Sequence, residues 1–240
     1  MARLPRLVVP GHLHLVLQRA PAGQVVFQDD EDFVAYRRAL GGALAGHGVA
    51  LHAYALTPSQ ALLLLTPAEP GGPSRLLQAV GRRFGGAYNR RHQRSGALWD
   101  GRFRATVVDP AYLVDATRYV ETAPVRAAAC TSAADHPWSS AAHHVGRHVD
   151  PDITEHRRFW QLGNTPFERE AAYRLLLEQP LPGALLQRMD DAVGKGWALG
   201  ERAFVERLAG EAPRRVAPLS RGRPRNKPVP KNVRGTSAGG

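Results

Sequence analysis

The hydrophobic pattern of the chain is densest over Val49–Thr66, where two short apolar runs are separated by Thr57-Pro58-Ser59. Residues Val49–Leu56 follow the two-residue alternation of a strand. Pro58 has no backbone N–H to give to a sheet, so it favours a turn or a sheet edge. Ala61–Leu65 is apolar at every position, which is typical of a central strand covered on both faces. The segment therefore predicts a buried pair of strands joined by a tight turn.

Further strands and helices flank this pair. Alternation predicts strands over His12–Arg19 and within Ala97–Val108. Helical spacing and capping residues predict helices from Asp29 or Asp30 to about Gly46, from Pro73 to Arg91, and from Pro110 to Pro124. The order is strand, helix, strand, strand, helix, strand, with one extra helix after it. This order predicts a ferredoxin-like α+β fold, in which helices cover one face of an antiparallel sheet.

The chain changes character from Ala127. Thr165-Pro166-Phe167-Glu168 is a capping box with proline at the first helical position, which predicts a helix over Pro166–Glu178. Two shorter helices are expected around Gly183–Val193 and Glu201–Leu208. Beyond Pro213 the chain is rich in proline, glycine and arginine and has no apolar periodicity. We therefore expect a first domain over residues 1–145, a helical appendage over 146–212 and a disordered basic tail over 213–240.

The formal net charge of +11 is concentrated in two stretches. Arg75–Arg104 contains eight arginines and a single acid, Asp100, and the segment after Glu211 contains eight basic residues and no acid. The rest of the chain has more acidic than basic residues. Clustered positive charge of this kind indicates a polyanionic partner, and nucleic acid is the usual one.

Two absences narrow the class of protein. No apolar run approaches the ~20 residues that a membrane helix needs, so we expect no membrane partner. The single cysteine, Cys130, excludes an internal disulfide and fits the reducing cytoplasm.

The arginines supply candidate phosphate contacts. In the helix that ends at Arg91, apolar residues fall on one face and arginines on the opposite arc, which suits a helix that follows a phosphate backbone; a merely solvated face gives the same pattern. Arg221-Gly222-Arg223-Pro224-Arg225 resembles an AT-hook core that lies in a narrow minor groove, and a generic basic tail is the alternative. The candidate DNA-binding residues are Arg82, Arg83, Arg90, Arg91, Arg102, Arg104, Arg221, Arg223 and Arg225.

Two other residue types invite a chemical interpretation. Tyr119 lies at the edge of the apolar stripe of the third helix, beside Asp115 and Thr122, and geometry alone indicates a core tyrosine whose hydroxyl reaches solvent. The later segment contains several histidines, and no cysteine or acid at a persuasive spacing completes a metal site. We interpret these as solvated surface residues: His136, His143, His144, His148 and His156.

Five ordered blocks resemble the REP-associated tyrosine transposases, which belong to the single-tyrosine HUH transposases of bacterial insertion sequences. The blocks are PGHLHLVLQR, HGVALHAYALTPSQALLLLTP, GRRFGGAYNRRHQRSGALWDGRF, RYVETAPVRA and HPWSS. They cover about Pro10 to Ser140 with little shift in spacing. The resemblance implies the ferredoxin-like fold and a DNA partner, which is single-stranded or carries a hairpin repeat.

The resemblance also implies a mechanism. In active members two histidines of a His-hydrophobic-His motif on a central strand hold Mg²⁺ or Mn²⁺, which polarises a scissile phosphate. A helix-borne tyrosine then attacks and forms a 5′-phosphotyrosine. Tyr119 matches the position of that catalytic nucleophile.

The chain departs from the family at the metal motif. Gln60 stands in place of the first histidine and Leu62 in place of the second, and a leucine cannot be a metal ligand. Ala123 replaces an asparagine of the family. These departures predict that this copy holds no metal or other cofactor and that Tyr119 is idle, so that the protein is a catalytically impaired, DNA-binding derivative of a transposase.

Two alternatives remain open from the sequence. An active single-strand nuclease or transposase could use substitute metal ligands such as His14 or His52. A module for structured RNA could use exposed aromatic residues on the sheet, for which Tyr54 is the obvious candidate.

Overall fold

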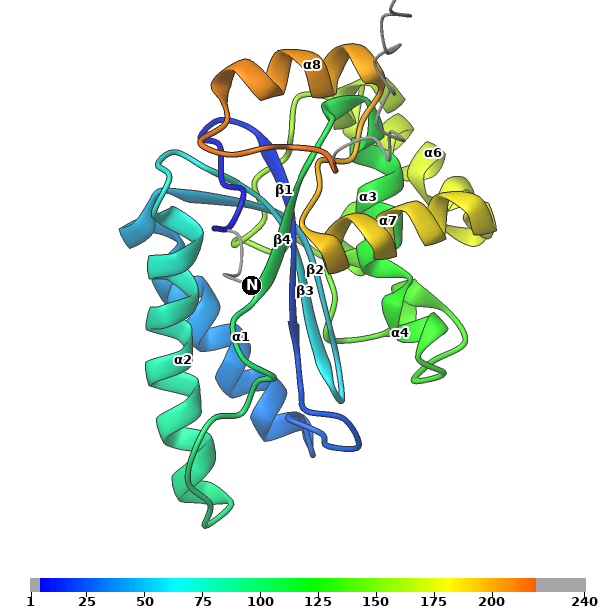
Figure 1. Cartoon of the computed structure of the whole chain (residues 1–240). Helices are drawn as coiled ribbons and strands as arrows, with labels where there is room; N and C mark the ends of the chain where they lie inside the picture. Colours follow the sequence, from blue (N-terminus) through cyan, green and yellow to red (C-terminus); the bar gives the residue numbers. More distant parts are fainter. Residues whose placement is uncertain (1–4, 219–240) are drawn as a thin grey trace, which may run out of the picture.

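A four-stranded antiparallel sheet forms the centre of the molecule (Figure 1). In the computed structural model, which describes residues 5–218, the strands lie in the order β2–β3–β1–β4. This is the strand order of the ferredoxin-like arrangement, so the predicted fold class is confirmed. The strands are β1 (Leu13–Arg19), β2 (Val49–Thr57), β3 (Gln60–Pro67) and β4 (Arg104–Val108).

The predicted strand pair is the hairpin of β2 and β3. Thr57 pairs with Gln60, which leaves Pro58 and Ser59 as the turn. The Ser59 carbonyl accepts a hydrogen bond from the Ala20 N–H at 2.8 Å, so the turn is tied to the end of β1. The side chains of β3 alternate between the two apolar clusters of the protein, and both sheet faces are therefore covered at this central strand.

Helices α1 (Asp30–Leu44) and α2 (Gly72–Arg91) cover one face of the sheet. Asp29 caps α1 by accepting hydrogen bonds from the N–H groups of Glu31 and Asp32. Tyr36 and Phe84 are fully buried between the helices and the sheet, and the Tyr36 hydroxyl donates to Gln18 of β1 at 2.7 Å. The apolar stripes read from the sequence thus face the sheet, and the arginines of α2 face outward.

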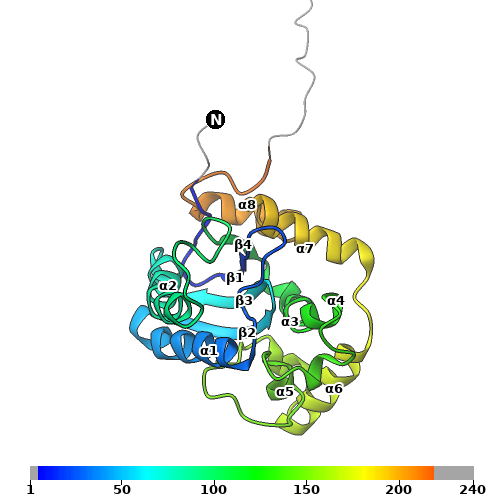
Figure 2. The same ribbon diagram turned by 90° about the horizontal axis from the view of Figure 1, so that it is seen from below.

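The second face of the sheet is covered by helices that follow β4. Figure 2 shows the sheet between α1 and α2 on one side and α3 and α4 on the other. These later helices are α3 (Leu113–Glu121), α4 (Ala123–Arg126), α5 (Ala141–His144), α6 (Pro166–Glu178), α7 (Gly183–Lys195) and α8 (Arg202–Glu211). Short 3₁₀ turns occur at η1 (Ala45–His47), η2 (Pro110–Tyr112), η3 (Ala133–Asp135) and η4 (Phe159–Leu162). The single helix expected over Pro110–Pro124 is therefore divided into three pieces.

A buried carboxylate joins three of these helices. Glu121, at the end of α3, has no exposed surface. It accepts hydrogen bonds from the Ser140 hydroxyl at 2.5 Å, from His144 Nδ1 at 2.6 Å and from the Tyr173 hydroxyl at 2.6 Å. Every one of its partners comes from a segment remote in sequence. The cluster therefore ties α3 to α5 and α6 and to the chain before α5.

The interpretation of all five later histidines as solvated surface residues was wrong for His136 and His144, which are buried, and His143 and His156 are half-buried. His144 is buried as a donor to Glu121, and His136 is buried with Nε2 donating to the Leu56 carbonyl at 2.7 Å. Burial lowers the pKa of His136. His148 is exposed as expected. Both buried rings link the segment after α4 to the rest of the domain.

Candidate functional site

Tyr119 lies on α3 and belongs to the apolar cluster between α3 and the sheet, which also contains Leu62 and Leu64 of β3. Its side chain is only 3% exposed, and its hydroxyl donates a hydrogen bond to Asp190 of α7 at 2.6 Å. The Arg126 guanidinium lies over the ring, 4.5 Å from its centre, and Nη2 of that arginine donates to the Tyr119 carbonyl at 2.7 Å. The hydroxyl was expected to reach solvent, and it is instead buried and hydrogen-bonded to Asp190 on a later helix.

The electrostatics of this phenol favour the protonated form. Burial raises the pKa of Tyr119, and the hydrogen bond to the Asp190 carboxylate raises it further. A tyrosine that attacks a phosphorus atom must first lose its proton. In this structure both the burial and the negative partner oppose that loss.

The strand that carries the altered metal motif lies beside Tyr119. Leu62 of β3 is buried in the same apolar cluster as Tyr119, and two residues earlier Gln60 is half-buried at the start of the strand. The geometry thus places the two substituted positions on the face of the tyrosine. Leu62 contributes hydrocarbon there and no donor atom. Among residues 5–218, no three His, Cys, Asp or Glu side chains gather in an arrangement that could hold a metal ion.

His14 and His52 are both committed to hydrogen bonds. His14 Nδ1 lies 2.7 Å from the His12 carbonyl, and its Nε2 accepts from the Val9 N–H at 3.2 Å. His52 Nδ1 lies 2.7 Å from the Thr154 carbonyl, and its Nε2 lies 2.8 Å from the Thr66 hydroxyl. Each ring has both nitrogens occupied.

Burial also decides the protonation of these two rings. It lowers the pKa of each histidine to about 4, and the hydrogen bond that each makes to a backbone carbonyl offsets this only in part. The alternation along β1 directs His14 to the face of α1 and α2, away from Tyr119. His14 therefore does not share a site with Tyr119, and His52 already has both ring nitrogens hydrogen-bonded, to Thr154 and to Thr66.

A basic cleft lies at the start of β4. Its volume is about 230 Å³, and five cations line it together with Pro5, Phe103 and small residues. Among the described residues, no Asp or Glu lines this cleft. The cations are Arg6, Arg102, Arg104, Lys195 and Arg214.

Two of these cations are held rigidly. Arg6 donates to the Phe103 carbonyl at 3.2 Å and lies 3.8 Å over the Phe103 ring. Arg214 donates to the Gly196 carbonyl at 2.6 Å and lies 5.5 Å over the Trp197 ring. Burial lowers the pKa of Arg214, because desolvation disfavours the charged guanidinium. A cleft with this charge is suited to an anion.

Of the predicted DNA-binding residues, the structure brings Arg102 and Arg104 together in this cleft. The candidates on α2 lie outside it. Arg82, Arg83 and Arg90 are exposed along α2, and no ion pair involves them in the part of the chain that the structure describes. Arg91 is different, because it makes ion pairs with three carboxylates at the start of α1: Asp29 at 2.5 Å, Glu31 at 2.7 Å and Asp32 at 2.9 Å. The tail candidates Arg221, Arg223 and Arg225 lie outside the described residues.

Sequence reasoning missed three members of the cleft. Arg6, Lys195 and Arg214 come from the first residues, the end of α7 and the segment after α8. Arg6 and Lys195 lie outside the two basic stretches and Arg214 begins the second one, so only the fold brings these residues beside Arg102 and Arg104. The sheet itself offers no exposed aromatic platform at Tyr54, because that ring is buried and its hydroxyl donates to Asp150 at 2.9 Å.

One solved structure of a known protein shares this architecture. No family model matches the chain, and no curated protein matches it. A solved REP-associated tyrosine transposase bound to a REP hairpin is similar over 66% of this chain and 93% of its own, with a TM-score of 0.53 and 15% identity. A putative transposase from Deinococcus radiodurans R1 covers 51% of this chain and 97% of its own, with a TM-score of 0.35 and 23% identity.

The first of these matches confirms the resemblance at the level of the fold. The chain has the α+β fold of a REP-associated tyrosine transposase, and about a third of it lies outside the match.

No helix of the described residues is both long and apolar enough to cross a membrane.

Proposed function

We propose that this protein binds DNA that carries a hairpin or an unpaired flank, and that it does so without the metal-dependent strand cleavage of the transposases it resembles. The observation that carries the proposal is the basic cleft at the start of β4, on a fold shared with a protein solved on a REP hairpin. The proposed partner is therefore a folded DNA strand rather than a small molecule.

The physics of the cleft supports phosphate binding. Each cation that neutralises a phosphate releases condensed counterions from the DNA, which favours binding at low salt. Arg102 and Arg104 make no ion pair within the described residues, so binding a phosphate breaks no existing pair. Arg82, Arg83 and Arg90 extend the positive surface along α2.

The surroundings of Tyr119 support the absence of cleavage. The phenol is buried and hydrogen-bonded to Asp190, and Leu62 offers no ligand on the face where the family places its metal. In the family, the tyrosine and the metal act on the same phosphate. The protonated phenol and the missing ligand at position 62 together therefore argue against cleavage more strongly than either does alone.

A hairpin oligonucleotide tests the proposal. The purified protein is incubated with the labelled hairpin in Mg²⁺, in Mn²⁺ and in chelator, and samples are run on native and denaturing gels. We expect a shifted native band under all three conditions and neither cleaved DNA nor a denaturant-stable adduct. A metal-dependent adduct that disappears in Tyr119→Phe would show that the site is active. The absence of any shift would reject DNA binding.

A further inference from the structure

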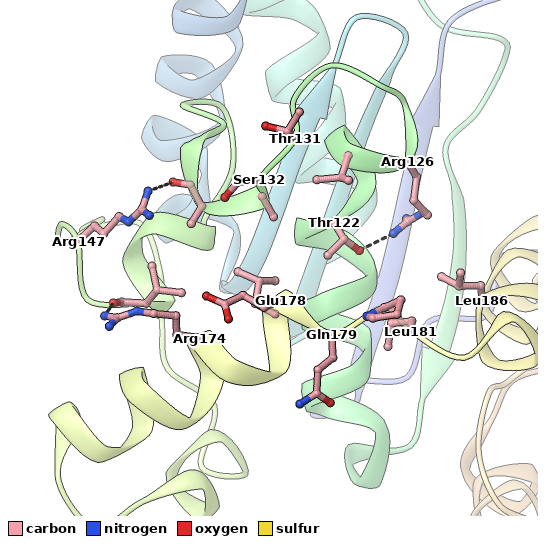
Figure 3. A pocket seen from close by; sticks show the side chains of 16 residues that line it. Thr122, Arg126, Thr131, Ser132, Arg147, Arg174, Glu178, Gln179, Leu181 and Leu186 are labelled. Carbon is pink, nitrogen blue, oxygen red and sulfur yellow. Dashed lines mark hydrogen bonds between the residues drawn. The ribbon is translucent and has the colours of Figure 1, made fainter.

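A cavity of about 440 Å³ lies one helical turn beyond Tyr119, and neither the proposed phosphate contacts nor the tyrosine chemistry uses it. Its walls are α4, η3 and the two residues before it, the end of α6 and the start of α7 (Figure 3). This volume is in the range of pockets that hold small organic ligands.

Much of the cavity wall is apolar. Val125, Leu177, Leu181 and Leu186 contribute to it, together with alanine and proline side chains. Thr122, Thr131 and Ser132 add hydroxyl groups. An apolar wall with a few hydroxyls suits a flat ligand that has polar atoms at its edge.

Two arginines that make no ion pair in the described residues stand at opposite ends of the cavity, although Asp190 acts electrostatically on one of them, Arg126. Arg126 donates only to neutral oxygens, those of Thr122 at 2.6 Å and the Tyr119 backbone at 2.7 Å. Arg174 donates to the Val145 carbonyl at 2.7 Å. In Figure 3 Arg126 lies at one end and Arg174 at the other.

Two further charged residues complete the lining. Arg147 lies near Arg174 and is paired with the Asp135 carboxylate, so its charge is already balanced. Glu178 lies between the two ends, and its carboxylate has no hydrogen-bond partner within residues 5–218. The cavity therefore offers a cation at each end and an acceptor in the middle.

We infer that this cavity takes one unpaired nucleotide of the bound strand. The base would lie against the apolar wall, and the phosphates on its two sides would meet Arg126 and Arg174. Glu178 would accept a hydrogen bond from an amino group of the base, which cytosine, adenine and guanine have and thymine lacks. A ligand with a single acidic end would leave one of the two arginines unmatched.

The inference rests on the proposed DNA binding. Three hairpins distinguish binding of the hairpin itself from binding of an unpaired nucleotide in the cavity. One is blunt, one carries a short cytosine overhang, and one carries an abasic overhang of equal length. Overhang phosphates are common to the last two, so any difference between them belongs to the base. We expect the cytosine overhang to bind about tenfold more tightly than the abasic one, which is the gain that packing and hydrogen bonding of one base permits.

Variants assign the overhang contacts to the cavity. Arg174→Gln should weaken binding of the cytosine and abasic overhangs alike, because both carry the phosphates, and should leave the affinity for the blunt hairpin within about twofold. Arg158→Gln is the matched control, since it removes an exposed positive charge outside the cavity. Glu178→Gln should reduce the preference for a cytosine over a thymine overhang. The melting temperature of each variant checks that the fold is intact.

The outcomes are distinct. Equal binding of the cytosine and abasic overhangs overturns the inference and leaves the proposed function standing if the blunt hairpin binds. If no hairpin binds, the proposed function fails. Calorimetry with dCMP then tests whether the cavity binds a nucleotide. Binding of dCMP that Arg174→Gln weakens would assign the cavity to free nucleotides, and no binding would reject a nucleotide site.

Discussion

At the scale of single residues, Leu62 and Tyr119 share one apolar cluster. A histidine at position 62 would bring a polar ring into that cluster, where leucine brings only hydrocarbon. The backbone position of the motif is kept, because β3 pairs regularly with β1 and β2 on both sides of Leu62. The strand is thus regular at the positions where the family resemblance would place two histidines, and Gln60 and Leu62 stand there instead.

Restoring the motif should therefore cost stability and return a metal response. Leu62→His is expected to lower the free energy of unfolding by about 2–4 kcal/mol, since a buried apolar side chain is replaced by a polar one. Gln60→His, at a half-buried position, should cost less than about 1 kcal/mol. Mn²⁺ should raise the melting temperature of the double variant and of neither single variant. A double variant indifferent to Mn²⁺ would show that these two positions do not form a metal site.

His52 makes stability depend on pH. Its pKa is about 4 in the folded protein against 6.5 for an ordinary histidine, mainly because it is buried. Between these values the unfolded chain binds more protons, so stability is complete above pH 6.5 and is lost as the pH falls towards 4. The contribution is about 3 kcal/mol by the linkage of pKa to free energy.

Urea unfolding between pH 4 and 8 measures this dependence. His52→Gln should flatten the part of the profile that His52 causes, while His14, whose pKa burial also lowers to about 4, keeps the remainder. His148→Gln is the control because that ring is exposed. An unchanged slope in His52→Gln would contradict the assignment.

At the scale of elements, the sequence predicted what local patterns determine. The helix over Pro166–Glu178 has the expected bounds, and it begins at Pro166 because Thr165 and Glu168 form the capping box in the structure. The strand pair and its two-residue turn also follow from local pattern. The break of the third helix was not predicted, although Pro124 lacks the N–H that a continuous helix would use.

The remaining features depend on contacts between remote segments. No periodicity indicates that Glu121 accepts from Ser140, His144 and Tyr173, or that Asp190 covers Tyr119. The basic cleft likewise combines the chain before β1 with the chain after α8. Sequence patterns fix which face of an element is apolar, and they do not fix which distant element covers it.

The Glu121 cluster predicts how three helices are held together. Glu121→Gln keeps the shape and removes the charge, which leaves His144 and Tyr173 as buried donors with a weaker acceptor. We expect the free energy of unfolding to fall by about 2–3 kcal/mol. Hydrogen exchange should accelerate first in α5 and α6. Glu170→Gln is the control at a more exposed carboxylate, and an equal loss in both variants would contradict a special role for Glu121.

At the scale of the whole molecule, the charge is positive and unevenly distributed. The overall value of +11 does not by itself identify a binding face. Within residues 5–218, the structure separates arginines that are ion-paired with carboxylates from arginines that make no ion pair. Arg91 belongs to the first group and Arg104 to the second, although both were equal candidates from the sequence.

This separation predicts the salt dependence of DNA binding. A cation that meets a phosphate contributes close to one unit to the slope of log affinity against log salt concentration. Arg104→Gln should therefore weaken binding to every hairpin and reduce the slope by about one. Arg91→Gln should change the slope far less, because its guanidinium is engaged by Asp29, Glu31 and Asp32, and should instead lower the stability of the α1–α2 contact. Titrations of both variants at several salt concentrations, beside their melting temperatures, distinguish the two roles. Equal slopes for the two variants would mean that carboxylate pairing does not decide which arginines reach the DNA.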